Sequence, residues 1–313
     1  MRTQLLIHPE ELSRKWIDRM AALGVECLAL HPVGGPAAAK SLDRMLEALT
    51  YPEYRALLDY AREKGLKIEY EFHAAGWLMP RKLFAEHPDW FRMNEKGERT
   101  DDMNFCITNE EALAYYAERA ALLASKLYAS EPNYYFWLDD VRGMTCHCEK
   151  CSKLTASEQQ MTMVNAVAKR LKQDNPNAKV AYLAYQDFIA PPVMVQPEDN
   201  VFVEYAPFDR DMNASVRLMP QWEQDNLKDL LTCFGAKDSK VLEYWLDNSF
   251  YSDWVRPTRR LTPDNARIRD DMQFYLDLGY ERISSFACFL GADYEELYGE
   301  PDIASFAQGG EDA

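Results

Sequence analysis

Residues 134–140 read Tyr-Tyr-Phe-Trp-Leu-Asp-Asp, an uninterrupted apolar run that ends in two carboxylates. A strand with one face in water alternates polar and apolar residues, whereas a strand buried on both faces is apolar throughout. The run is therefore typical of a parallel strand covered by other layers of the protein. Asp139 and Asp140 would mark its carboxyl end, where α/β proteins carry their functional side chains.

Seven further runs of this kind lie on either side of it. With residues 134–138 they make eight predicted strands: Leu5–His8, Val25–Leu30, Lys67–Phe72, Tyr134–Leu138, Val180–Tyr185, Val201–Tyr205, Val241–Leu246 and Ile283–Phe289. Apolar residues at helical spacing follow most of them, over Glu10–Leu23, Tyr51–Lys64, Glu110–Tyr128, Glu158–Gln173, Gln221–Cys233 and Pro263–Leu278. Strands and helices thus alternate from one end of the chain to the other.

Eight strand–helix units in 313 residues predict an α/β fold, a single (β/α)8 TIM barrel over residues 1–306, with long loops after the third and fourth strands. A doubly wound open sheet is the alternative, because the segment 186–200 is rich in proline and lacks the helical pattern that a barrel leads us to expect there. Residues 307–313 are predicted to form a disordered tail.

The composition narrows the classes of partner. The chain has 51 acidic and 35 basic residues, and its formal net charge of −16 argues against nucleic acid or a membrane surface, because both attract a basic face. No segment approaches the roughly 18 consecutive apolar residues of a membrane span. The first residues, MRTQLLIHPEEL, lack the apolar core of a signal peptide. We therefore expect a cytoplasmic protein whose mature chain starts at Met1, with a homodimer as the default state.

Polar and aromatic residues gather where the predicted strands end, at the side of the barrel that carries the active site in this fold. In strand order these residues are His8, His31, His73, Asp139 with Asp140, Tyr185, Tyr205, and Trp245 with Asp247. Three strands begin at the opposite side with Lys67, Lys179 and Lys240, which we interpret as solvated residues. The sequence therefore predicts a site at one mouth of the barrel.

The adjacent carboxylates Asp139 and Asp140 are the sharpest feature of this mouth. Neighbouring like charges oppose each other's ionisation, so one of the two groups can hold a proton. A protonated carboxyl is the general acid that glycoside hydrolysis needs at the leaving oxygen. Where a 2-acetamido group of the substrate is the nucleophile, the second carboxylate can orient that group. The alternative is a turn or helix cap, in which the aspartates accept hydrogen bonds from loop N–H groups.

Three aromatic residues at the strand ends, Tyr185, Tyr205 and Trp245, are candidates for a sugar pocket. An indole face stacks on the apolar face of a pyranose, and a phenol hydroxyl can hold a carbonyl oxygen of the substrate. In the alternative interpretation the three residues belong to the barrel core. The other expected substrate contacts are His31, His73 and Asp247.

The histidines after the first three strands suggest a different kind of site. His8, His31 and His73 could bind a catalytic divalent metal together with Asp139, as in metal-dependent barrel isomerases and hydrolases. However, no His-x-His pair follows the first strand, and both His8 and His31 precede a proline, which is also a strand terminator.

Four cysteines predict a second, structural metal site. Cys146, Cys148 and Cys151 form a Cys-x-Cys-x-x-Cys motif in the loop after the fourth strand. Cys106 precedes the helix that follows the third strand, so it should lie in the neighbouring loop at the same mouth. Four thiolates are a typical zinc ligand set, although unligated thiols or a disulfide remain the alternative, and the spacing does not distinguish zinc from iron.

The stretch Pro80–Arg99 (PRKLFAEHPDWFRMNEKGER), the FCITN sequence at Phe105–Asn109, the acidic pair and the CHCEKC motif resemble an uncharacterised bacterial domain family associated with glycoside hydrolases. The resemblance covers about Phe72–Cys151. Similar barrels occur in the retaining β-N-acetylhexosaminidases of glycoside hydrolase families 20, 84 and 123, which use Asp-Glu or Asp-Asp after the fourth strand. The second residue is Asp here, as in family 84 and unlike family 20, whose His-x-Gly-Gly lead-in is also absent.

This resemblance implies that Asp139 orients the 2-acetamido group, that Asp140 is the acid/base, and that Cys106 belongs with the cysteine motif. We therefore predict an exo-acting retaining β-N-acetylhexosaminidase, specific for GalNAc or GlcNAc, with no catalytic cofactor and a structural zinc ion. The alternatives are a divalent-metal-dependent isomerase or deacetylase of sugars and a carbohydrate-binding barrel without activity.

Overall fold

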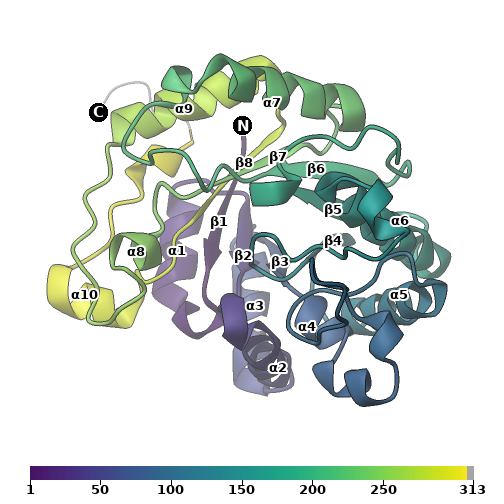
Figure 1. Cartoon of the computed structure of the whole chain (residues 1–313). Coiled ribbons are helices and arrows are strands. Elements are labelled where there is room, and N and C mark those ends of the chain that lie inside the picture. Colours follow the sequence, from purple (N-terminus) through teal and green to yellow (C-terminus); the bar gives the residue numbers. More distant parts are fainter. Residues whose placement is uncertain (309–313) are drawn as a thin grey trace.

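Eight parallel strands close into a barrel in the computed structural model, which describes residues 1–308 (Figure 1). The strands are β1 (Arg2–Ile7), β2 (Cys27–Leu30), β3 (Lys67–His73), β4 (Asn133–Trp137), β5 (Lys179–Ala184), β6 (Val201–Tyr205), β7 (Lys240–Glu243) and β8 (Arg282–Phe286). Each strand pairs in parallel with the next, and β8 pairs with β1. The predicted (β/α)8 barrel is confirmed, and the open-sheet alternative is wrong.

Helices surround the barrel (Figure 1). The longer ones are α1 (Arg14–Ala22), α2 (Ala38–Ala48), α3 (Pro52–Glu63), α5 (Glu110–Ala124), α6 (Ala156–Asp174), α7 (Gln221–Phe234) and α9 (Asn265–Leu278), and the shorter ones are α4 (Ala75–Leu78), α8 (Asn248–Tyr251) and α10 (Ala292–Tyr298). The sequence pattern does not predict α2. Within the described part of the chain, the segment between β5 and β6 contains only the short 3-10 helix Gln186–Phe188, as its prolines indicate.

Side-chain caps set where several helices begin. The Ser13 hydroxyl accepts a hydrogen bond from the backbone N–H of Trp16, so α1 begins at Arg14 and not at the predicted Glu10. Asn109 caps α5 in the same way. This second cap fixes the end of the long loop between β3 and α5, which carries part of the site described below.

Alternate residues of each strand face opposite sides. On β4, Tyr135 and Trp137 point into the barrel, where they join an apolar cluster with Leu183 of β5. Their neighbours Tyr134 and Phe136 pack in the layer between the barrel and the helices. The alternation of side chains along each strand therefore determines which of them can reach the mouth of the barrel at the carboxyl ends of the strands, called the carboxyl mouth below.

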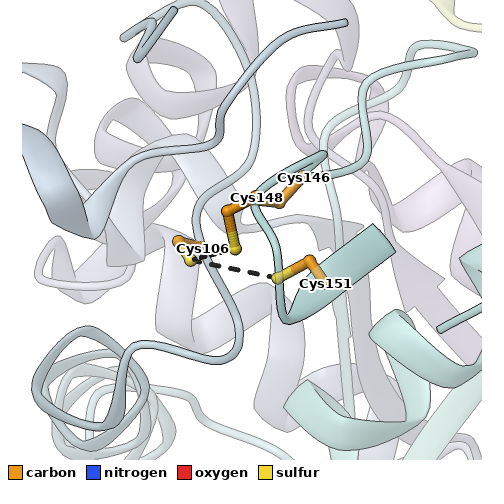
Figure 2. A group of neighbouring side chains, drawn as sticks. All are labelled: Cys106, Cys146, Cys148 and Cys151. Carbon is orange, nitrogen blue, oxygen red and sulfur yellow. Dashed lines mark hydrogen bonds between the residues drawn. The ribbon is translucent and has the colours of Figure 1, made fainter. Parts of the chain in front are cut away.

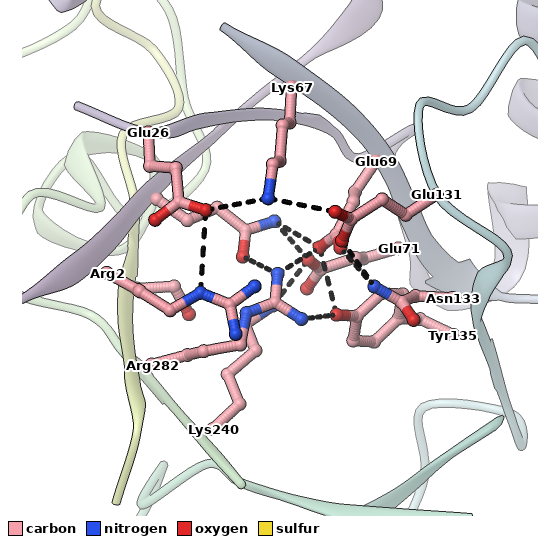
Figure 3. A network of polar contacts seen from close by, with 12 residues as sticks. Arg2, Glu26, Lys67, Glu69, Glu71, Glu131, Asn133, Tyr135, Lys240 and Arg282 are labelled. Carbon is pink, nitrogen blue, oxygen red and sulfur yellow. Dashed lines mark hydrogen bonds and ion pairs between the residues drawn. The ribbon is translucent and has the colours of Figure 1, made fainter. Parts of the chain in front are cut away.

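A network of charged side chains fills the amino end of the barrel interior (Figure 3). Lys240 begins β7 and is fully buried, and its ammonium group pairs with Glu71 and lies 2.8 Å from Oε1 of Glu204. Arg282, at the start of β8, pairs with Glu69 at 2.6 Å. The prediction that Lys240 is solvated is therefore wrong, because the first residue of β7 lies on the inward face of that strand.

Burial and charge compete within this network. Burial raises the pKa of the Glu71 carboxyl well above its ordinary value against the opposing charge of Lys240, and the nearby Glu204 and Glu69 raise it further. Glu69 is also buried, but the positive charges of Arg282 and Lys240 lower its pKa to about 2. The two cations therefore compensate the carboxylates inside the barrel, and loss of either cation would leave negative charge buried.

The last described residues pack against the start of the chain. The backbone N–H of Gln308 donates to the carbonyl oxygen of Leu23 at 2.8 Å, and its side-chain amide donates to the Thr3 hydroxyl at 3.0 Å. Gln308 of the predicted tail 307–313 is thus held by these contacts, residues 309–313 lie outside the described part, and the disordered tail stays a prediction. No described helix is long and apolar enough to cross a membrane. The homodimer and the cytoplasmic location stay predictions.

Candidate active site

A cavity of about 430 Å³ opens at the carboxyl mouth of the barrel. Aromatic and aliphatic side chains form most of its wall and a few polar groups face it, which is the usual composition of a small-molecule site. The polar residues are His8, His31, His73, Asp140, Tyr185, Tyr244, Asp247 and Ser249, and the apolar ones include Trp137, Leu183, Phe208, Leu242, Trp254 and Phe286. Of the predicted catalytic and substrate-binding residues, the cavity brings together Asp140, His31, His73, Tyr185 and Asp247, but not Asp139, Tyr205 or Trp245.

Asp140 follows β4 and faces the cavity with its side chain one-third exposed. The Tyr185 hydroxyl, at the end of β5, donates a hydrogen bond of 2.9 Å to Oδ1 of Asp140. Burial and the adjacent Asp140 charge raise the pKa of Tyr185 well above its ordinary value, so the phenol keeps its proton. The other carboxylate oxygen, Oδ2, lies 3.9 Å from Nε2 of His73. One oxygen of Asp140 is therefore held, and the other makes no hydrogen bond to a described residue.

Asp139 points away from the cavity, into the loop after β3. Its carboxylate forms an ion pair with Arg81, and Oδ2 accepts a hydrogen bond of 2.5 Å from the backbone N–H of Asn104. The Asn104 side chain accepts in return from the backbone N–H of Asp139 at 2.9 Å. These contacts match the alternative in which the aspartate accepts from loop N–H groups. In this geometry Asp139 ties two loops together and does not reach a substrate in the cavity.

Asp247 brings a second carboxylate to the cavity, from the segment between β7 and α8. Its Oδ1 accepts hydrogen bonds from the backbone N–H and the hydroxyl of Ser249, at 3.1 and 2.5 Å, and so caps α8. Burial raises its pKa above the ordinary value, against the effect of these hydrogen bonds. No described group donates to its Oδ2, so this oxygen is available to a ligand.

The three histidines are held in one common orientation. Each Nδ1 lies within hydrogen-bond distance of a backbone carbonyl oxygen of the next strand or its loop: His8 at 2.7 Å from His31, His31 at 2.8 Å from Glu71, and His73 at 2.6 Å from Leu138. A carbonyl oxygen can only accept, so each ring donates its Nδ1–H. Nε2 is then the acceptor atom of the uncharged ring.

This arrangement does not favour the catalytic-metal alternative. The ring centroids of His8 and His31 lie 5.9 Å apart, and those of His31 and His73 lie 6.4 Å apart. Within residues 1–308, one group contains at least three ligand atoms of histidine, cysteine or carboxylate side chains that all lie within 4.8 Å of one another. Its members are all cysteines. The ligand atoms of His8, His31, His73 and Asp139 therefore do not form such a group in the described part of the chain.

Tyr205 and Trp245 lie in the layer outside the barrel. The Tyr205 hydroxyl donates to Glu223 of α7 at 2.8 Å, and Trp245 packs against Phe306. Their positions do not fit the sugar contacts predicted for them, because each is one residue away from an inward-facing position. On the inward face the cavity is lined by Tyr244.

Trp137 and Tyr244 are two of the cavity residues that the sequence interpretation missed, and Ser249, Phe208 and Trp254 are among the others. Trp137 also donates its indole N–H to Oε2 of Glu204 at 3.0 Å, which joins the floor of the cavity to the charged network beneath it. No local sequence signal could have selected these residues, since an uninterrupted apolar run does not reveal which alternate positions face inward.

The predicted cysteine cluster forms beside this mouth, as Figure 2 shows. Sγ of Cys106 lies 3.7 Å from that of Cys148 and 3.9 Å from that of Cys151, and Cys146 completes a buried group. Tetrahedral zinc with Zn–S bonds of roughly 2.3 Å would separate its sulfur ligands by about 3.8 Å. The four cysteines are thus compatible with a metal site, and they join the loops that follow β3 and β4. The Thr108 hydroxyl, 3.1 Å from Sγ of Cys151, is an additional polar contact of the cluster.

Solved structures with a similar fold include a β-galactosidase from the psychrophilic Marinomonas ef1 (11% identity, TM-score 0.50, 91% of this chain and 54% of that one). Another is a protein described as a glycoside hydrolase (11% identity, TM-score 0.50, 91% of this chain and 88% of that one). At this identity the likeness concerns the fold alone, and the chain spans about half the length of the β-galactosidase.

No curated protein matches the sequence significantly. Residues 44–283, which are most of the chain, match a family described as "Domain of unknown function (DUF4838)". The region that carries the FCITN and CHCEKC motifs lies inside this segment. The protein therefore belongs to the DUF4838 family.

Proposed function

We propose that the protein is a glycoside hydrolase that removes a sugar from the end of a glycan, with Asp140 as the proton donor. The observation that carries the proposal is the position of Asp140, a partly buried carboxyl held by Tyr185 in an aromatic-walled cavity. A cavity of about 430 Å³ lies in the size range of small-ligand sites and suits a terminal sugar better than a long chain.

The chemistry follows from two carboxylates on different strands. Asp140 donates its proton to the glycosidic oxygen as the bond to the anomeric carbon breaks, and the departing aglycone leaves as an alcohol. Asp247 is the second carboxylate, with one oxygen fixed by Ser249 and the other available. It stabilises the positive charge that develops on the sugar, either directly or through the group that attacks the anomeric carbon.

The narrower proposal is a retaining β-N-acetylhexosaminidase that uses the substrate's own 2-acetamido group. The acetamido carbonyl oxygen would attack the anomeric carbon to form an oxazolinium intermediate, and Asp140 would then deprotonate the water that opens it. The sequence motifs support this proposal. The carboxylate that holds the acetamido N–H would be Asp247, because Asp139 is paired with Arg81 outside the cavity.

Hydrolysis of aryl β-glycosides of GalNAc, GlcNAc, galactose, glucose and glucuronic acid tests both levels of the proposal. Cleavage confined to the 2-acetamido sugars supports the narrower one. Cleavage of sugars without that group would contradict it and assign the attack to a protein carboxylate or to a water that a carboxylate activates. Binding without cleavage of any glycoside would contradict both and favour the non-catalytic carbohydrate-binding barrel.

We also propose that Cys106, Cys146, Cys148 and Cys151 bind a structural zinc ion. The expected result is about one zinc per chain by elemental analysis. Substitution of Cys106 by serine should reduce the bound zinc to a small fraction of this, because a hydroxyl is a poor replacement for a thiolate ligand. Cys233→Ser is the matched control, since Cys233 lies outside the cluster and should leave the zinc content unchanged.

Removal of this zinc should lower the melting temperature. It should also reduce activity, because the loops after β3 and β4, which position Asp140, would lose the link between them. A chelator that abolishes activity at an unchanged melting temperature, with recovery on addition of a divalent metal, would instead favour the metal-dependent enzyme. Wild-type protein that contains neither zinc nor iron after purification without chelators would contradict the structural site.

A further inference from the structure

The row formed by His8, His31 and His73 has free acceptor atoms that face the cavity. Each ring donates through Nδ1, and no described residue makes a hydrogen bond with any of the three Nε2 atoms. Nε2 of His73 lies 3.9 Å from Oδ2 of Asp140, which is beyond hydrogen-bond distance. The three residues are only 5 to 8% exposed, so a partner must reach them from the cavity that they line.

The charge of the cavity indicates what such a partner carries. No lysine or arginine is among the described residues that line it, whereas the carboxylates of Asp140 and Asp247 are. Burial, together with the neighbouring His8 and His73, lowers the pKa of His31 well below its ordinary value, so that ring stays uncharged. A carboxylate or sulfate on a ligand would meet negative charge and acceptor atoms, with no cation to compensate it.

We infer that the histidine row is an acceptor subsite for adjacent free hydroxyls of an uncharged sugar, and that the cavity discriminates against uronic acids and sulfated sugars. Hydroxyls are the donors that a sugar offers in series around one ring, and three acceptors on three successive strands match such a series. The rings are spaced at 5.9 and 6.4 Å along the row. The inference rests on the proposed function and specifies its substrate class.

The first test compares sugars that differ only in charge at carbon 6. Aryl thioglycosides resist cleavage, so their binding to the wild-type protein can be measured directly by calorimetry or by competition. The β-thioglucoside is compared with the β-thioglucuronide, and the β-thiogalactoside with the β-thiogalacturonide. We expect each uronide to bind at least about tenfold more weakly than its neutral partner, because its carboxylate would meet the carboxyl groups of Asp140 and Asp247 with no lysine or arginine among the described lining residues.

The second test replaces the hydroxyls of the tightest neutral ligand one at a time with hydrogen or with fluorine. Fluorine can accept a hydrogen bond but cannot donate one. If the histidines accept, both replacements weaken binding at each contacted hydroxyl, by about two- to tenfold. If the histidines donated instead, fluorine would be tolerated better than hydrogen.

Variants assign each hydroxyl to a ring. The amide of an asparagine can keep the donated hydrogen bond near the position of Nδ1 while removing Nε2, so His31→Asn removes only the proposed acceptor. In that variant, replacement of one particular hydroxyl should no longer weaken binding of the sugar. His8→Asn and His73→Asn are the parallel variants, and in each of them replacement of a different hydroxyl should no longer weaken binding. With three variants, the test does not fail if one of them does not fold.

Two results would overturn the inference and leave glycoside hydrolysis intact. One is a uronide that binds as tightly as its neutral partner, and the other is full retention of binding by the fluorinated sugars at every position. If no glycoside is bound or cleaved, the proposed function fails and the inference fails with it.

Discussion

Replacement of Asp140 by asparagine is expected to lower kcat/KM for the cleaved glycoside by about 100-fold to 10,000-fold, the range that a positioned general acid contributes. The amide keeps the shape of the side chain and its contact with the Tyr185 hydroxyl, but it has no proton of suitable acidity for the glycosidic oxygen. The melting temperature should change little, because the side chain is one-third exposed and its ion-pair contact among residues 1–308 is the 3.9 Å approach to His73. Steady-state kinetics and thermal unfolding of the same preparation check both parts.

The leaving group separates loss of the acid from loss of structure. A dinitrophenyl aglycone departs without protonation, so Asp140→Asn should lose much less activity on it than on an alkyl or methylumbelliferyl glycoside. Asp139→Asn is the matched control at the adjacent position. It leaves the Arg81 guanidinium without its anion, so it should lower stability and reduce activity by a factor that does not depend on the leaving group.

The same two variants also test whether Asp139 takes part in turnover together with Asp140. The motif resemblance implies that loss of Asp139 should slow turnover nearly as much as loss of Asp140. The ion pair with Arg81 leads us to expect a smaller effect that follows stability. Activity close to wild type in Asp140→Asn, or a leaving-group dependence found only in Asp139→Asn, would contradict the assignment of Asp140 as the acid.

Replacement of Lys240 by methionine is expected to lower the free energy of unfolding by about 3–5 kcal/mol, the range measured when one partner of a buried ion pair is removed. Lys240 is fully buried between Glu71 and Glu204, and the substitution leaves these carboxyl groups inside the barrel without their cation. Urea unfolding followed by fluorescence would measure the change.

A matched control begins a neighbouring strand. Lys179 stands at the first position of β5 as Lys240 does in β7, but its side chain is partly exposed in its pair with Asp238. Lys179→Met should therefore cost less than about 1 kcal/mol. Addition of Glu71→Gln to Lys240→Met should recover part of the lost stability, because it removes one uncompensated carboxyl. Equal losses for the two lysine variants would contradict the role of the buried network.

The cysteine cluster is the part of the mouth that local sequence predicts best. Three of its members lie within six residues, so the chain itself keeps them close, and Cys106 lies in the loop of the adjacent strand. The aromatic residues of the cavity show the opposite situation. Tyr205 and Trp245 lie at or next to the ends of predicted strands as Tyr185 does, yet only Tyr185 lines the cavity. Uniformly apolar runs carry no mark of which face is inward, because both faces are buried.

Sequence alone determined that this chain forms a barrel of eight parallel strands and that polar residues gather at one mouth. Both features depend on local patterns of hydrophobicity that repeat along the chain. Tertiary structure decided the direction of each side chain. Asp139 and Asp140 are neighbours in the sequence and follow the end of β4 at Trp137. Their carboxylates lie apart because Asp139 pairs with Arg81 outside the cavity, whereas Asp140 accepts a hydrogen bond from Tyr185 inside it. The local sequence around Lys240 predicts a solvated side chain, but the residue lies inside because carboxylates from β3 and β6 compensate its charge across the closed barrel.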